Sequence, residues 1–119
     1  MSLPFAGKFT LIEKDSLHPS LGTKLDPWLE EHAHLRRAIV VGNCTDLCIY
    51  QLAMYLRLRA NAFGSSDVDV VVPAACVATY DMPDESAPPG VLAHEGDFFH
   101  AVFLYHLALN GVRVVKEII

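Results

Sequence analysis

The chain is poor in positive charge and in cysteine, and it has no long apolar run. Lys and Arg total 9 against 14 Asp and Glu, so the 119 residues carry a formal net charge of −5. A basic surface of the kind that binds nucleic acid is therefore not expected. No apolar run reaches the ~18 residues that a membrane-spanning helix needs. We expect neither nucleic acid nor a membrane as a partner.

The cysteines and histidines do not show the spacings of a disulfide-bonded or metal-binding protein. Three cysteines are an odd number at no disulfide-scaffold spacing, which favours a reducing cytoplasm. Six histidines are present, but none shows a zinc-site spacing with Cys or Asp partners. The sequence therefore predicts no metal site and no cofactor.

The apolar residues, 52% of the chain, suffice for a core, and the length suits one domain over residues 1–119. Short β-branched runs alternate with amphipathic stretches. We expect strands over 9–14, 38–42, 68–72 and 112–115, and helices starting after Asp26, over 45–61 and over 98–109, with a loop over 81–96. This order predicts an α/β fold of three layers, α/β/α, with a parallel Rossmann-like sheet. Loops after Lys14, Gly42 and Cys76 should face one common site.

One segment combines features that suit a reactive thiol. A buried strand runs into Gly42, turns tightly, and starts a helix whose first turn holds Cys48. The free N–H groups at a helix start favour the thiolate, and they can also bind the oxyanion that forms when sulfur attacks a carbonyl. A small buried cysteine at a strand–helix joint is an equally good interpretation of this geometry alone.

The residues of this segment resemble a known motif. Gly42, Thr45, Asp46 and Cys48 match the Gly-x-x-Thr-Asp-x-Cys-Val turn of the isochorismatase-like cysteine hydrolases, with Ile49 in place of the usual valine. That group includes nicotinamidases and carbamoyl-amidohydrolases. The segment 12–16 similarly resembles the strand that delivers the family's lysine, and it places Lys14 at that position.

The resemblance implies a set of roles. The family's triad is aspartate, lysine and cysteine, which makes Cys48 the nucleophile and Lys14 the cation that favours its thiolate. The oxyanion hole would be formed by the backbone N–H groups of Cys44 and Cys48. An unusual cis peptide bond between Asn43 and Cys44 would orient them. The substrate would be a small amide or carbamoyl compound, attacked to give a thioester.

The sequence departs from the family at the aspartate. In the family this residue ends the first strand, well upstream of the lysine, but the thirteen residues before Lys14 contain no aspartate. We therefore expect an N-terminally truncated domain that lacks its first strand, has little or no amidase activity, and self-associates as a homo-oligomer through exposed apolar surface.

Two other functions remain open. The chain could be a catalytically silent binding or assembly subunit, or a thiol redox protein that uses Cys44 and Cys48. We expect Asp46 to complement the helix dipole and Cys76 to be a core residue in a strand. His94, His100 and His106 are expected to fill ordinary surface or core roles. Tyr80, Phe98 and Phe99 suit either a pocket wall or simple packing.

Overall fold

The computed structural model describes residues 6–65 and 67–119. Within them, the helices are α1 (Leu25–Glu31), α2 (Tyr50–Ala62) and α3 (Gly96–Leu109). The strands are β1 (Arg37–Ile39), β2 (Gly42–Asn43), β3 (Asp69–Pro73), β4 (Val77–Ala78) and β5 (Arg113–Val115). No helix of these residues has the length and apolarity that a bilayer crossing requires.

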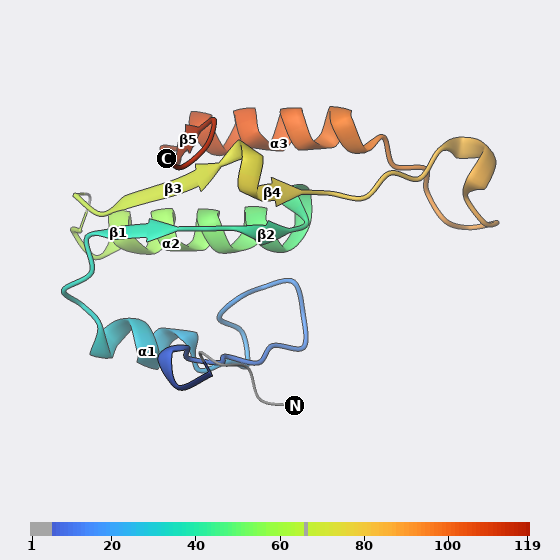
Figure 1. Ribbon diagram of the computed structural model, residues 1–119. Helices are drawn as coiled ribbons and strands as arrows, with labels where there is room; N and C mark the ends of the chain where they lie inside the picture. Colours follow the sequence, from blue (N-terminus) through green and yellow to red (C-terminus); the bar gives the residue numbers. More distant parts are fainter. Residues whose placement is uncertain (1–5, 66) are drawn as a thin grey trace.

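The sheet is parallel, as the alternation of strands and helices predicts. Three strands pair in the order β1-β3-β5, with Ala38 opposite Val70 and Val72 opposite Val114. Beyond β1 the chain continues into β2, which pairs in parallel with β4. Figure 1 shows the two pairings following one another along the same direction. The predicted α/β class is confirmed.

Two helices cover one face of the sheet. α2 packs on β3, and α3 packs on β5 (Figure 1). The two helices also contact each other, and the rings of Tyr50 and Phe103 meet edge to face at 5.0 Å. The core between them is built from the β-branched residues of the strands and small or branched residues of the helices. Its members are Val40, Ile49, Ala53, Val70, Val72, Val77, Leu104, Leu107 and Val112. Such continuous apolar runs are typical of buried parallel strands.

The opposite face of the sheet is more open. Ile39 and Val41 point to it, and their exposed fractions are 47% and 54%. A charged bridge crosses the same sheet, in which Asp69 accepts hydrogen bonds from Arg113 at 2.8 Å and from Arg37 at 3.0 Å. The Arg113 hydrogen bond, with Arg37, lowers the pKa of Asp69 to about 2. The helical layer predicted for this face is not among the described residues.

The predicted strand over residues 9–14 is wrong. This segment is irregular, and Phe9 and Leu11 are 69% and 83% exposed. A strand is stable only when a neighbouring strand takes up its backbone hydrogen bonds. No strand of the described residues pairs with this segment, so its alternating apolar pattern has nothing to pack on.

Two helices begin earlier than predicted, and in both an aspartate joins the first turn to a distant residue. α1 starts at Leu25, which leaves Asp26 in its first turn, where the carboxylate accepts a hydrogen bond from the Tyr55 hydroxyl. Burial, together with Asp26, raises the pKa of Tyr55. α3 starts at Gly96, whose N–H donates to the Asp81 carboxylate at 2.8 Å.

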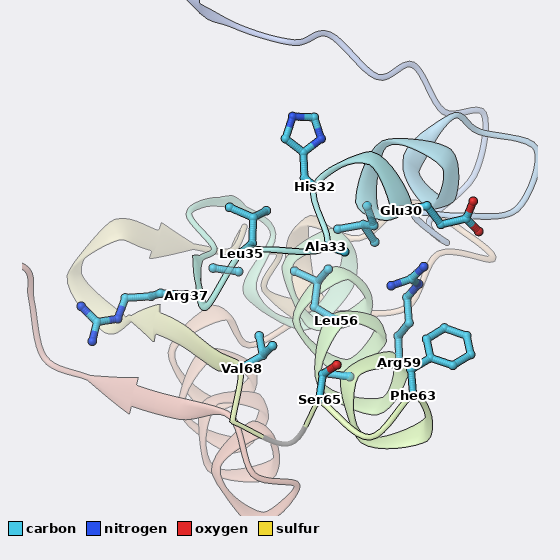
Figure 2. Close-up of a pocket in the computed structure, with 13 residues that line it drawn as sticks. Glu30, His32, Ala33, Leu35, Arg37, Leu56, Arg59, Phe63, Ser65 and Val68 are labelled. Atoms are coloured by element: carbon cyan, nitrogen blue, oxygen red, sulfur yellow. The ribbon is translucent and has the colours of Figure 1, made fainter.

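A hollow of about 320 Å³ lies beside β1, between α1 and α2. Figure 2 shows apolar side chains of Leu35, Leu56 and Val68 around it, with Arg59 and Phe63 at one side. β1 pairs with β3 along one edge only, so within residues 6–65 and 67–119 its other edge has no neighbour. The hollow therefore adjoins an open strand edge.

Candidate active site

The nucleophile candidate lies on a tight turn whose backbone is fixed from both sides. Gly42, the first residue of β2, has a φ of +124°, a conformation that side-chain-bearing residues rarely adopt. β2 is held by its pairing with β4. The next five residues, Thr45–Ile49, form a π-helical turn that leads into α2 and carries Cys48. The sequence pattern predicted an α-helix from residue 45, so the first turn differs from that prediction.

The peptide bond between Asn43 and Cys44 is cis. This is the bond for which the family resemblance implies the cis form. The Cys44 carbonyl accepts the N–H groups of Leu47 and Ile49 at 3.0 and 3.1 Å, so the turn closes directly on it.

Lys14 meets Cys48 although 34 residues separate them. The Lys14 Nζ lies 3.4 Å from the Cys48 Sγ and donates to the Ser16 carbonyl at 2.8 Å. The second contact holds the ammonium group in place. A cation this close favours the thiolate form of a cysteine, which is its nucleophilic form. The structure thus brings together the two side chains that the sequence singled out.

No carboxylate of the described residues bonds to either member of this pair. Lys14 makes its hydrogen bonds to Cys48 and to the Ser16 carbonyl, and it forms no ion pair. The carboxylate nearest in sequence to Cys48, that of Asp46, is turned to other partners. Within residues 6–65 and 67–119, no three His, Cys, Asp or Glu side chains gather as metal ligands would.

Asp46 has a larger role than the predicted helix-start charge. Its side chain is only 5% exposed, and it accepts hydrogen bonds from the Thr79 hydroxyl at 2.6 Å and from His94 Nε2 at 2.6 Å. Burial alone would raise the pKa of Asp46, but the hydrogen bonds from Thr79 and His94 outweigh it and hold that pKa below its usual 3.8. Asp46 therefore ties the nucleophile turn to the segment after β4 and to the loop before α3.

The sequence analysis did not find this Asp46–His94 contact. The two residues are 48 positions apart, and neither spacing nor residue type in the loop over 81–96 marks His94 as special. The other two histidines have ordinary partners, since His100 meets the Thr45 hydroxyl at 2.8 Å and His106 meets the Tyr50 hydroxyl at 2.9 Å.

Cys76 is not the core residue that the sequence predicted. It lies in the short 3-10 turn Ala74–Cys76, after the end of β3, and it is exposed. Pro73 ends the buried strand before this point, so the thiol emerges at the surface. Cys44 and Cys48 are half-buried, and all three thiols are free.

Comparisons with known proteins agree with this geometry. No protein-family model matches the chain. Nicotinamidase 1 of Arabidopsis thaliana is 35% identical over 94 residues, which cover 76% of this chain and 38% of that protein. The crystal structure of a nicotinamidase from Staphylococcus aureus superposes with a TM-score of 0.62 at 25% identity, over 90% of this chain and 53% of that one.

A cysteine hydrolase from Pseudomonas syringae pv. phaseolicola has the same fold, with a TM-score of 0.64 at 20% identity over 88% of this chain and 44% of that one. The chain thus spans about two fifths to one half of the length of these relatives. Fold and cysteine turn define an α/β protein of the cysteine hydrolase class. The chain belongs to the isochorismatase-like cysteine hydrolase superfamily.

Proposed function

We propose that this chain carries the nucleophile and the lysine of a cysteine amidohydrolase that acts on a small amide or carbamoyl substrate. The observation that carries the proposal is the 3.4 Å approach of Lys14 Nζ to Cys48 Sγ at the start of a strand–turn–helix unit. An ammonium group beside a thiol is an arrangement that activates sulfur, whereas a structural cysteine has no need of one.

The proposed reaction proceeds in two steps. The Cys48 thiolate attacks the carbonyl carbon, and the negative charge on the carbonyl oxygen is stabilised by the N–H groups of Cys44 and Cys48. Ammonia leaves with a proton from a general acid, and a thioester forms. Water then adds to the thioester and gives up a proton to the conjugate base, which releases the carboxylic acid and restores the thiolate. The net change is amide plus water to acid plus ammonia.

The proposed reaction also needs a general acid and base beside Cys48 and Lys14. In the family that the chain resembles, it is an aspartate on a strand inside the sheet. The open edge of β1 and the hollow of about 320 Å³ next to it offer room for one more strand. We propose that a carboxylate-bearing strand completes the site there, and that residues 1–119 alone hydrolyse amides slowly or not at all.

Nicotinamide is the first substrate to test, because two relatives are named nicotinamidases. The test compares hydrolysis of nicotinamide and small carbamoyl amides by the chain alone and by a chain extended with the upstream genomic sequence, if that encodes an aspartate-bearing strand. A general acid–base typically contributes about 10²- to 10⁴-fold to a rate, so the extended chain should be faster by that order. Cys48→Ala should abolish the activity, and Cys76→Ala should leave it unchanged.

Equal activity of the two chains would show that a carboxylate of residues 1–119 suffices. Asp15 is then the first to replace, because Asp46 is occupied by Thr79 and His94. Activity that survives Cys48→Ala would overturn the nucleophile assignment.

An assembly role is the second candidate, and the exposure of Ile39 and Val41 on the open sheet face supports it. A homo-oligomer would cover these side chains whether or not the chain is active.

Three free thiols, one of them the proposed nucleophile, suit the reducing cytoplasm as the compartment.

A further inference from the structure

The ring of His94 has an acceptor at each nitrogen. Nδ1 lies 2.7 Å from the Tyr80 carbonyl oxygen, and Nε2 lies 2.6 Å from the Asp46 carboxylate. A carbonyl oxygen can only accept, so Nδ1 must carry a proton. A neutral ring would then have a bare Nε2 facing the carboxylate, which requires the one proton between them to sit on Asp46.

The surroundings favour the proton on the histidine. The Thr79 hydroxyl donates to the other oxygen of Asp46, which stabilises the ionised carboxylate. The ring of His94 lies between those of Tyr80 and Phe99, with centroids 4.0 and 4.7 Å away and planes within 16° and 13° of parallel. Aromatic faces attract a cation. These contacts favour an imidazolium paired with a carboxylate.

The backbone around His94 is fixed as well. His94 and Met82 exchange both backbone hydrogen bonds, at 2.7 and 2.8 Å. Two residues further on, a Cβ on Gly96 would come within 2.8 Å of the Tyr80 carbonyl oxygen, so only glycine fits there. His94 is therefore held in place by its own loop, and through Asp46 it is bonded to the turn that carries Cys48.

We propose that His94 is a positioning residue, whose positive charge holds Asp46 and with it the Thr45–Ile49 turn in the conformation that exposes Cys48 as a nucleophile. This inference rests on the proposed function of Cys48 but not on any particular substrate. The charged groups that act on His94 are Asp46 from the turn and Asp81 from the loop; the phenol of Tyr80 and the ring of Phe99 from α3 complete the contacts.

A direct test is the protonation state of the ring, measured by ¹H–¹⁵N NMR of histidine-labelled protein. The His94 signals are assigned by their loss in His94→Gln. We expect both ring nitrogens to be protonated at pH 7, and the titration midpoint to fall in Asp46→Asn. A neutral ring at pH 7 would overturn the proposal. If Asp46→Asn does not fold, Asp81→Asn, which removes the other charge acting on the ring, should lower the same midpoint.

The second test measures the effect on Cys48 without any hydrolysis. Iodoacetamide labels Cys48 and Cys76 in the same molecule, and peptide mass spectrometry gives the ratio of the two rates. His94→Gln keeps an amide donor but not the charge, and His94→Ala keeps neither. We expect the ratio to fall on the order of tenfold in His94→Ala, the effect of losing a hydrogen bond to a charged group, and less in His94→Gln. His34→Gln, at an exposed histidine after α1, is the matched control.

The pH profile separates charge from shape. The ratio of Cys48 to Cys76 alkylation should differ between wild type and His94→Gln below the His94 titration midpoint. Above that midpoint, where the wild-type ring is neutral, the two ratios should converge. If the difference in Cys48 alkylation between the two proteins does not vary with pH, the charge of His94 has no role and the side chain acts only through packing. If the chain extended with its upstream sequence also hydrolyses no amide but the profiles converge as stated, the proposed function fails and the positioning role stands.

Discussion

The chain divides into two regions with similar sequence patterns and different structures. Residues 37–115 form a sheet with two helices, and their apolar residues are buried at Val70, Val72 and Leu107. Residues 6–36 contain comparable apolar residues, yet Phe9, Leu11 and Leu21 are all at least 69% exposed. The difference is one of partners, because the first region pairs its strands with each other and the second has no strand to pair with among the described residues. The N-terminal region nevertheless delivers Lys14 to Cys48.

The largest contrast in stability is expected between a leucine in each region. Leu107 is completely buried, so Leu107→Ala should lower the free energy of unfolding by about 2–5 kcal/mol through lost burial and a cavity. Leu11 is 83% exposed, and Leu11→Ala should change it by less than about 0.5 kcal/mol. Urea unfolding followed by circular dichroism measures both. A large loss for Leu11→Ala would mean that the N-terminal region packs on something in solution.

Lys14 should matter for reactivity and not for stability. Lys14→Met removes the ammonium group 3.4 Å from the Cys48 sulfur, and we expect alkylation of Cys48 at pH 7 to slow on the order of tenfold, since the thiolate loses a nearby cation. The unfolding midpoint should not move. Lys116→Met, at the other end of the chain, is the control.

The order in which Cys48 and Cys76 are alkylated in the wild-type protein also tests the effect of Lys14 on Cys48. Cys76 is exposed and Cys48 is half-buried, so accessibility alone would make Cys76 react first. We expect Cys48 to react first, because charge outweighs access here. Labelling of Cys76 ahead of Cys48 would contradict the assignment of Lys14.

A moderate effect of pH on stability should arise in the first region. Asp46 has a lowered pKa, so its contribution is complete above pH 3.8 and is lost as the pH falls through that lowered value. His94 has a pKa raised by the Asp46 hydrogen bond, so its contribution is complete below pH 6.5 and is lost as the pH rises through the raised value. Stability from the pair is therefore greatest between about pH 4 and pH 6.5, and it declines as the pH rises through the His94 midpoint. His94→Gln should flatten the alkaline decline in melting temperature.

The smallest effect is expected at the open face of the sheet. We expect a dimer at micromolar concentration, and Ile39→Lys should weaken it by placing a charge on the apolar surface. Sedimentation velocity measures the change. If the wild-type protein is a monomer at this concentration, the proposed homo-oligomer is wrong.

Much of the region 37–115 was predictable because its signals are local. The β-branched runs before Gly42 and Pro73 are both parallel strands in the structure, although only the second is largely buried, since Ile39 in the first is 47% exposed. The glycine that follows the first run has the positive φ that only glycine adopts easily. The motif around Cys48 likewise selected Cys48, and the resemblance of segment 12–16 selected Lys14. Helix starts were less accurate, since Asp26 bonds to Tyr55 of α2 and α3 begins at Gly96, whose N–H bonds to Asp81.

The sequence by itself predicted the parallel α/β class, the family and the two residues at the centre of the candidate site, because these predictions depend on periodicity and on short motifs. Only the tertiary structure decided that residues 9–14 form no strand, that Cys76 is exposed, and that Asp46 bonds to His94. Each of these depends on which distant segment supplies a partner. A buried carboxylate and a histidine 48 residues apart find each other through the packing of a whole sheet, and no local pattern encodes that distance.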